Sequence, residues 1–516
     1  MIESTKHISW VSYPRIEATR DSIHKAILQV TERHCTYADL FLERKSTGYL
    51  KMARKMVDSF VKGAKNFIIQ TDFDADGITS GIIWYNYLAR LGSVTIRIPS
   101  RDQGHATLVP LLEAMQLNKD AHLVILDNGT NLIAQLLGHM GPHQKALIVD
   151  HHQLESPDIP HDDRITIINP HILPGYKLEN DLSTAGLSYY LLPESDHKSL
   201  ILAGLGQLGD VMPLSPLSHQ IARQTVDRLQ KETPDSLAPI IPKDISVQSL
   251  TFQTIPRINS VSRMAHPLFA YMVLSSNAPD KSMFLEIERL NSARQATTIS
   301  FYEQATKQVT ANDIQVIYIP ELPPSIAGLI AARIAGLTCK PTLALGNKTS
   351  TQLSGSFRSP VDIDLAAIIR RFQAIGIIWG GGGHKRAAGL NLDIIQLPRL
   401  YQALAEIKVT IQRTYLPVPL LQFPTLTEYY KELEPYGSGS PPPFWGIPYI
   451  KCSYQPLYTK ADNRHWANQG TLYTPIGNIS TLDCGKRKWK PSGIAIGQID
   501  WDTYRNQYIL RMEDIL

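Results

Sequence analysis

The sequence predicts a multidomain α/β protein with a doubly wound parallel-sheet lobe, a long connecting helix, a second α/β lobe and a small C-terminal β-barrel. Short apolar runs alternate with helix-length segments in the first half of the chain. A stretch without Gly or Pro follows, and the last part of the chain holds short β-like runs between turn residues. At 516 residues the chain is too long for one hydrophobic core, so several domains are expected.

The first lobe is predicted from five apolar runs of strand length. They are Lys65–Thr71, Val94–Ile98, His122–Leu126, Ala146–Val149 and Ile165–Ile168. The segments between them, such as the helical pattern Ile78–Leu91, are long enough for helices, which is typical of a doubly wound sheet. We expect this lobe at residues 61–278, after a helical region at residues 1–60. Its ligands should lie beyond the carboxyl ends of the strands.

The second half of the chain is predicted to repeat the α/β pattern once more. The expected domains are a connecting helix at residues 279–312, a second α/β domain at residues 313–410, a linker at residues 411–443 and the β-barrel at residues 444–516. The α/β domain is predicted because the strand pattern Ile314–Ile319, the helical pattern Ile326–Thr338 and the strand pattern Thr342–Leu345 alternate.

Composition limits the class of protein. The N-terminal residues Met1–Trp10 contain no apolar core, so we expect neither a signal peptide nor a membrane span. The four cysteines lack paired spacing, which argues against disulfides or a thiolate zinc site and predicts a reducing, cytoplasmic location. The net charge of +4 is nearly balanced, so binding of nucleic acid would need a local basic surface.

Three aspartates alternate directly after the first predicted strand. Asp72, Asp74 and Asp76 would repel one another unless a cation holds them, and Gly77 follows at a helix start. The same pattern also suits helix caps, Asx turns or a calcium loop. The preceding strand and the lack of a Glu at the last position of a calcium loop weigh against the calcium interpretation.

Further acidic and imidazole groups follow later strands and one helix. Asp127 and the triplet Asp150-His151-His152 end apolar strands, and Asp210 stands at the end of a predicted helix, where an acid opposes the helix dipole. A carboxylate and imidazole set without cysteine suits Mn²⁺ or Mg²⁺ better than structural zinc. Two such ions about 3.5–4 Å apart would hold a phosphodiester, activate water and stabilise the leaving oxygen, so no protein nucleophile is needed.

These motifs resemble those of the DHH phosphoesterase superfamily, whose signature is the Asp150-His151-His152 triplet with flanking acidic motifs in this order. Several motifs further resemble the RecJ-like exonucleases. They are Thr71-Asp-Phe-Asp-Ala-Asp-Gly-Ile-Thr-Ser80, Gly209-Asp-Val-Met-Pro-Leu214, Pro256-Arg-Ile-Asn-Ser-Val-Ser-Arg263, Leu290-Asn-Ser-Ala-Arg-Gln295, Ser354-Gly-Ser-Phe-Arg-Ser359, Gly381-Gly-Gly-His-Lys-Arg-Ala-Ala-Gly389 and Leu433-Glu-Pro-Tyr-Gly-Ser-Gly439. They cover almost the whole chain.

The resemblance implies a DHH lobe, a long helix, a DHHA1 lobe and an OB-fold. It also implies 5′-to-3′ removal of nucleotides from single-stranded DNA with two Mn²⁺ or Mg²⁺ ions, in DNA repair and recombination. A helicase or a single-strand-binding protein is the candidate protein partner, and no membrane is involved. The implied metal ligands are Asp74, Asp76, Asp127, His151 and Asp210, with Asp127 as the bridge. Asp72, Asp150 and His152 would hold or tune these ligands. Asp150 and His152 are also the candidate catalytic residues, with His152 within reach of the scissile phosphate.

The sequence departs from the family pattern at three places. Gln70 stands where several relatives carry a histidine ligand, so one metal would be held more loosely or by water. Gln207-Leu208-Gly209 replaces the usual Thr-Val-Ala, and Gly104-His105-Ala106 replaces an expected Gly-Tyr-Gly. These changes leave the acidic set intact and bear on substrate preference.

Binding of DNA needs fixed cations and stacking surfaces. The candidate phosphate contacts are Arg257, Arg263, Arg358, His384 and Lys385, and the glycine run Gly380–Gly383 would allow close backbone approach. The final segment carries the basic residues Lys486, Arg487, Lys488 and Lys490 among the aromatic residues Trp466, Tyr473, Trp489 and Tyr504. Such a mixture suits sequence-tolerant binding of single strands, with about half of the aromatics expected in the barrel core.

Two other functions fit parts of the pattern. A hydrolase of short oligonucleotides or small phosphorylated nucleotides is disfavoured, because a dinucleotide gains nothing from a remote stacking surface. A catalytically silent scaffold that binds single strands is disfavoured because the main Asp and His set is retained. A pure DNA-binding regulator lacks support, since no helix-turn-helix or zinc-finger pattern is present.

Overall fold

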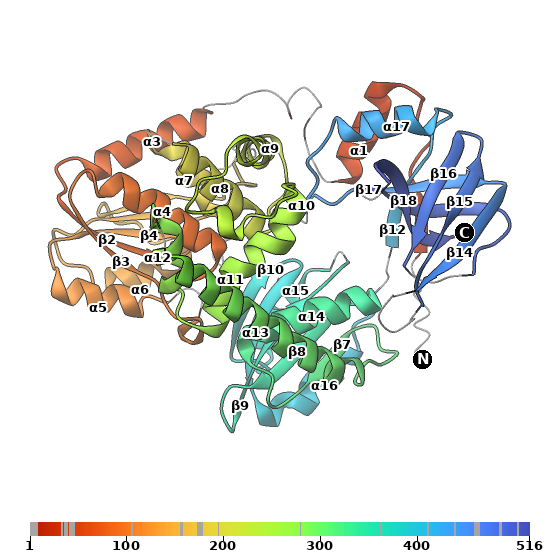
Figure 1. The fold of residues 1–516 in the computed structure, drawn as a ribbon. Helices are drawn as coiled ribbons and strands as arrows, with labels where there is room; N and C mark the ends of the chain where they lie inside the picture. Colours follow the sequence, from red (N-terminus) through yellow and green to blue (C-terminus); the bar gives the residue numbers. More distant parts are fainter. Residues whose placement is uncertain are drawn as a thin grey trace.

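The structure, a computed structural model, consists of two α/β lobes and a C-terminal β unit (Figure 1). It describes residues 9–31, 35, 40, 47–104, 107–154, 158–172, 179–193, 196–278, 280–361, 363–409, 412–437, 440–458, 465–484, 488–502 and 505–516. The predicted α/β multidomain class is confirmed, with its doubly wound lobe, connecting helix, second α/β lobe and C-terminal β unit. Within the described residues, every helix is too short or too polar to cross a bilayer.

The first lobe is built on a parallel sheet with the strand order β3-β2-β4-β5-β6. Its strands are β2 (Asn66–Thr71), β3 (Ser93–Arg97), β4 (His122–Leu126), β5 (Ala146–Val149) and β6 (Ile165–Ile168). After β2 the chain crosses to β3 on one side and then returns to β4 on the other side. The strand order therefore reverses beside β2, and such a switch point opens a crevice at the carboxyl ends of the strands.

Helices cover both faces of this sheet, because the strand side chains are apolar on both sides. One face packs against α5 (Val109–Leu117) and α6 (Ile133–Leu137). The other face packs against a larger layer, which consists of α3 (Gly48–Val61), α4 (Ala75–Leu88), α7 (Thr184–Leu191), α8 (His197–Gly209), α9 (Pro216–Lys231), α11 (Ile255–Met264) and α12 (Leu268–Ser275). The second layer brings α4, α7 and α8 together above the switch point.

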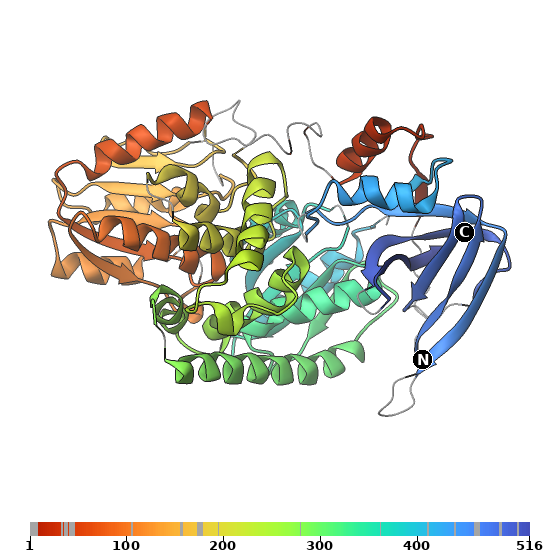
Figure 2. The same cartoon turned by 45° about the horizontal axis from the view of Figure 1, so that its top comes forward.

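A single helix, α13 (Lys281–Thr306), connects the two lobes and runs along the lower edge of the molecule in Figure 2. The second lobe has a mixed sheet with the order β10-β11-β9-β8-β7. Its strands are β7 (Gln315–Tyr318), β8 (Thr342–Asn347), β9 (Gln352–Arg358), β10 (Gly380–His384) and β11 (Ala387–Asp393). Helix α14 (Pro324–Thr338) covers one face, and α15 (Leu365–Ala374) and α16 (Leu397–Ala405) cover the other.

The C-terminal unit is an eight-stranded sheet that includes residues from both halves of the chain. Its order is β1 (Ser9–Ser12), β12 (Gln412–Pro417), β13 (Phe444–Tyr449), β17 (Gly493–Asp502), β18 (Gln507–Ile515), β16 (Gly477–Asp483), β15 (His465–Thr474) and β14 (Lys451–Tyr458). Among the described strands, the pairing runs from β1 to β14 without joining these two ends. Helices α1 (Arg20–Val30) and α17 (Phe423–Lys431) pack on it, with Trp445 in the core.

The boundaries of this unit differ from the expectation. The N-terminal region was expected to be helical and separate, but β1 pairs with β12 and α1 lies beside α17 (Figure 1). The expected linker at residues 411–443 contributes β12 and α17. The first difference arises because β1, with four residues, has no local signal of its own, and its partner lies about 400 residues away.

The N-terminal helix should stabilise the C-terminal unit. Ile27 is fully buried in the same core as Trp445, so Ile27→Ala should lower the free energy of unfolding of this unit by about 2–5 kcal/mol. Hydrogen exchange of β13 and β17 in the full chain measures this effect. Lys25→Ala on the exposed side of α1 is the matched control and should change stability by less than about 0.5 kcal/mol. Equal exchange in both variants would contradict the shared core.

Candidate metal centre and arginine cleft

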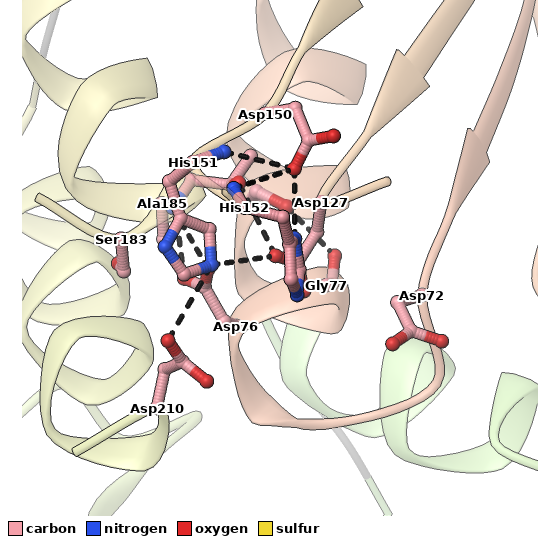
Figure 3. Close-up of polar contacts among 12 residues, drawn as sticks. Asp72, Asp76, Gly77, Asp127, Asp150, His151, His152, Ser183, Ala185 and Asp210 are labelled. Atoms are coloured by element: carbon pink, nitrogen blue, oxygen red, sulfur yellow. Dashed lines mark hydrogen bonds and ion pairs between the residues drawn. The ribbon is translucent and has the colours of Figure 1, made fainter. Parts of the chain in front are cut away.

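The predicted acidic residues gather at the switch point of the first lobe. Figure 3 shows the side chains of Asp76, Asp127, His151 and Asp210 directed toward one another. They come from the turn after β2, the end of β4, the end of β5 and the end of α8. Parallel strands place their carboxyl ends at one edge, so residues far apart in sequence meet there.

The turn between β2 and α4 is shaped by its own aspartates. Asp74 caps α4, and its Oδ1 accepts hydrogen bonds from the main-chain N–H groups of Asp76 (3.0 Å) and Gly77 (3.2 Å). At Gly77 a side chain would overlap the main-chain carbonyl of Asp72, so glycine is required there. The capping carboxylate and the glycine together fix the direction of the whole Asp-rich turn.

Asp76 is held by the start of another helix. Its two carboxylate oxygens accept hydrogen bonds from the N–H groups of Thr184 (2.8 Å) and Ala185 (2.9 Å), the first residues of α7. The positive end of the helix dipole thus faces a buried carboxylate. Burial still dominates and, with the charge of Asp74, raises the pKa of Asp76 to about 6.

His151 is the centre of the cluster. Its Nε2 lies 3.2 Å from Asp127 Oδ1, 3.4 Å from Asp210 Oδ2 and 3.9 Å from Asp76 Oδ2. Asp127 reaches this position from a left-handed backbone conformation with φ of 62°, which is costly for a residue other than glycine. One imidazole nitrogen and three carboxylates therefore converge from four separate elements.

The cluster is electrostatically unbalanced on its own. Burial, and then the neighbouring carboxylates, raise the pKa of Asp127 and Asp210 well above the ordinary aspartate value. Oxygen and imidazole donors without a thiolate suit a hard divalent cation such as Mn²⁺ or Mg²⁺. The residues present fit such an ion, because its charge would offset the repulsion that the protein leaves uncompensated.

Two overlapping groups of donor atoms share Asp127. Asp127, His151 and His152 form one group, and Asp72, Asp74 and Asp127 form the other, each with all its donor atoms within 4.8 Å of one another. Asp127 would therefore contribute a carboxylate oxygen to both groups if each held an ion. Asp72 was expected only to support the ligands, yet its carboxylate lies close enough to bind metal itself.

Asp150 fixes the neighbouring imidazole. It accepts hydrogen bonds from the main-chain N–H groups of His151 (2.8 Å), His152 (3.2 Å) and Thr130 (3.1 Å), and from His152 Nδ1 (2.8 Å). Burial lowers the pKa of His152, but the hydrogen bond and charge of Asp150 outweigh it and raise the pKa to about 9. The His152 side chain is 36% exposed, so it faces the solvent side of the cluster.

Gln70 does not take the place of a histidine ligand. Its Nε2 donates to the Thr107 carbonyl at 2.6 Å, and its Oε1 accepts from the Leu111 N–H at 2.9 Å. Both ends of the buried carboxamide are therefore bound to the main chain around the start of α5. In this chain the position holds a loop in place and does not extend the donor set.

Three arginines from different elements meet beside the acidic cluster. Arg101 follows β3, Arg263 lies on α11 and Arg358 ends β9 of the second lobe. Burial, and then the charges of Arg101 and Arg358, lower the pKa of Arg263 to about 9, and burial and Arg101 lower the pKa of Arg358 to about 10. Burial lowers the pKa of Arg101 and outweighs the charges of Asp74 and Asp72, which raise it. These half-buried guanidinium groups form a cation cluster between the lobes, which we call the arginine cleft.

The prediction of this cleft was incomplete. Arg101 was missed, and its signal was its place after a strand that borders the switch point. Arg257 was predicted, but it forms an ion pair with Glu288 on α13 and donates to the Gln253 carbonyl. Lys385 is exposed in the turn between β10 and β11, at the same end of the sheet as Arg358. His384 ends β10, but its side chain lies outside the described residues.

Of the four aromatic residues expected to divide between core and surface, the structure describes the side chains of Trp489 and Tyr473. Trp489 is buried and donates to Asp483, whereas Tyr473 is half-buried beside the Lys451 ammonium group. Trp501 is 43% exposed on β17. The predicted residues His105, Lys486, Arg487 and Tyr504, and the side chain of Trp466, lie outside the described residues.

Comparison with known proteins agrees with this geometry. Residues 66–208 match the DHH family, N-terminal domain, and residues 312–410 match the DHHA1 domain. The single-stranded-DNA-specific exonuclease RecJ of Thermus thermophilus is 25% identical over 421 residues, which cover 77% of this chain and 61% of that protein. The chain thus spans less than two thirds of this relative.

Solved structures share the fold. The RecJ structure from Thermus thermophilus in complex with Mn²⁺ has a TM-score of 0.79 and 20% identity, over 99% of this chain and 79% of that chain. The structure with Mg²⁺ has a TM-score of 0.73 and 19% identity, over 98% and 78%. At this identity the match establishes the common fold, including the arrangement of the lobes.

The crowded carboxylates make a prediction about stability. Asp127→Asn removes a buried charge and keeps a residue type that tolerates the left-handed backbone, so in EDTA it should raise the melting temperature. With Mn²⁺ at about 100 times its Kd, the unaltered protein should gain about 2.7 kcal/mol, and the variant much less. Calorimetry in both conditions checks this. Exposed Asp120→Asn is the control, and a variant destabilised in EDTA would contradict the repulsion.

Proposed function

Because the chain is a RecJ-like DHH/DHHA1 protein, we propose that it is a metal-dependent exonuclease that removes nucleotides from the 5′ end of single-stranded DNA. The observation that carries the proposal is the placement of the acidic cluster beside the half-buried arginine cleft. A phosphodiester backbone needs both: cations that hold successive phosphates and a site that hydrolyses one of them.

The metal centre would be held by the carboxylates and the imidazole at the switch point. The proposed ligands are Asp74, Asp76, Asp127, His151 and Asp210, with Asp72 close enough to join them. When bound, Mn²⁺ or Mg²⁺ ions supply an activated water and stabilise charge on the scissile phosphate. Asp76 is fixed by two N–H groups of α7, so its carboxylate is already oriented before an ion arrives.

The remaining residues position the substrate. Asp150 fixes the ring of His152 through Nδ1, and the exposed side of this ring can contact the scissile phosphate. Arg101, Arg263 and Arg358 would bind neighbouring phosphates, because Arg offers paired donors that match phosphate oxygens. Lys385 stands at the same end of the second lobe and would extend the basic path. The strand would therefore lie between the two lobes.

The C-terminal unit would hold the strand farther from the scissile bond. Tyr454 and Tyr458 on β14 and Trp501 on β17 are 40%, 52% and 43% exposed. Stacking of a base on such a ring contributes on the order of 1–3 kcal/mol and does not depend on which base is bound.

We also propose a role in DNA repair and recombination in the cytoplasm. A helicase or a single-strand-binding protein would present the single strand to the enzyme.

A nuclease assay tests the proposed function. With Mn²⁺, single-stranded DNA labelled at either end should release mononucleotides from the 5′ end, and Asp127→Ala should abolish release while Asp120→Asn keeps it. Single-stranded RNA and duplex DNA should remain uncut. Cleavage restricted to very short oligomers would favour a small-substrate hydrolase. Binding of single-stranded DNA without cleavage, in both Mn²⁺ and Mg²⁺, would favour the alternative of a catalytically silent scaffold.

The arginine cleft makes a separate prediction. Arg358→Ala removes a charged phosphate contact, so the KM for single-stranded DNA should rise roughly 10–100-fold, by the usual strength of such bonds. The slope of log affinity against log salt should fall by about 0.7 for each lost contact. Arg257→Ala is the matched control, because Arg257 is paired with Glu288. An unchanged salt slope for Arg358→Ala would exclude the proposed contact.

A further inference from the structure

The C-terminal unit contacts the first lobe close to Asp210, one of the proposed metal ligands. The contact is made by Glu434, Gly437 and Ser440, which lie between α17 and β13. It meets Leu214 and His219, just beyond the Asp210 carboxylate. We call these contacts the junction.

Two hydrogen bonds define the junction. The Leu214 N–H donates to Ser440 Oγ at 2.8 Å, and Ser440 has no exposed surface. His219 Nε2 lies 3.0 Å from the Glu434 carbonyl, which can only accept, so His219 carries a proton on Nε2. Leu214 and His219 are also buried. Buried hydrogen bonds of this kind are costly to lose, because the remaining partner is left without water.

Packing at the junction is equally close. A Cβ atom added to Gly437 would lie 3.3 Å from Leu214 Cδ1 and 3.4 Å from Val247 Cγ1. Main-chain hydrogen bonds between Gly437 and Ser440, of 3.1 and 3.0 Å, close the loop that presents the Ser440 hydroxyl. These bonds hold Ser440 beside Gly437, at the point where Ser440 receives the Leu214 N–H.

The link from the junction to the metal centre is short and strained. Asp210 caps the end of α8, and its N–H donates to the Gly206 carbonyl at 3.0 Å. Val211 then adopts φ of 58°, a left-handed conformation that is strongly disfavoured for a β-branched side chain, and its side chain is 49% exposed. Little packing on Val211 itself holds this conformation. Anchors on both sides, α8 and Leu214, must hold it instead.

We propose that Ser440 and His219 are positioning residues of the metal centre, through which the C-terminal unit fixes the direction of Asp210. Their bonds keep Leu214 in place, which keeps Val211 left-handed and the Asp210 carboxylate 3.4 Å from His151 Nε2. Without them, the Val211 backbone would relax and the carboxylate would turn away. This inference rests on the proposed metal centre, and it assigns to the C-terminal unit a task besides holding DNA.

The test measures Mn²⁺ binding to the full chain by the paramagnetic resonance signal of free Mn²⁺. Ser440→Ala should lower the affinity for one of two Mn²⁺ ions roughly 10–100-fold, because loss of the residues that orient metal ligands has an effect of this size. The Mn²⁺ concentration for half-maximal nuclease activity should rise in parallel, while kcat at saturating Mn²⁺ returns to the unaltered value. His219→Leu should act in the same direction. In an Asp210→Asn background, Ser440→Ala should cause no further loss.

The control separates positioning from general stability. Thr481→Val removes another buried hydroxyl of the C-terminal unit, which donates to the Gly470 carbonyl at 3.2 Å, and it should leave Mn²⁺ affinity unchanged. Unaltered affinity in Ser440→Ala and His219→Leu, or an equal loss in Thr481→Val, would overturn the inference alone. Absence of Mn²⁺ binding by the unaltered protein would overturn the proposed function and the inference with it.

Discussion

Mutual repulsion among buried carboxylates is the constraint on which the first lobe depends. Asp76, Asp127 and Asp210 are drawn together by separate elements, and each has its pKa raised by burial and by neighbouring carboxylates, among which Asp74 acts on all three. Helix α7 offsets part of this cost by pointing two N–H groups at Asp76. Without a cation, the repulsion among these carboxylates lowers the stability of the fold. A bound divalent cation would offset this repulsion, so the same arrangement favours tight binding of the ion.

The fold and the acidic cluster were largely predictable because both follow from local patterns. Apolar runs marked every strand of the first sheet, and the residues just after β2, β4 and β5 had to meet once the sheet was parallel. The arginine cleft was only partly predictable, because charge alone does not distinguish Arg358 in the cleft from Arg257, which pairs with Glu288. Only the packing of the two lobes separates them.

Three other features had no local signal. The pairing of β1 with β12 joins residues about 400 positions apart in the sequence. The role of Gln70 depends on its hydrogen bonds to the main chain near α5. The comparison with a histidine ligand in the family pattern gives no indication of these bonds. The Ser440 contact depends on where a loop of the C-terminal unit arrives. Each is a tertiary contact of high sequence separation, which periodicity and motif spacing do not encode.

The parallel pairing of Ser12 with Tyr415 also sets an order of assembly during translation. At about 5–20 residues per second, the ribosome needs roughly 20–80 s to make the chain between β1 and β12. During this interval β1 has no strand to pair with, although the first lobe is already synthesised. Nascent β1 and α1 must remain unassembled through that interval, with the apolar face of α1 exposed to chaperones and proteases. The β1 segment is thus synthesised long before the strand that completes its native pairing.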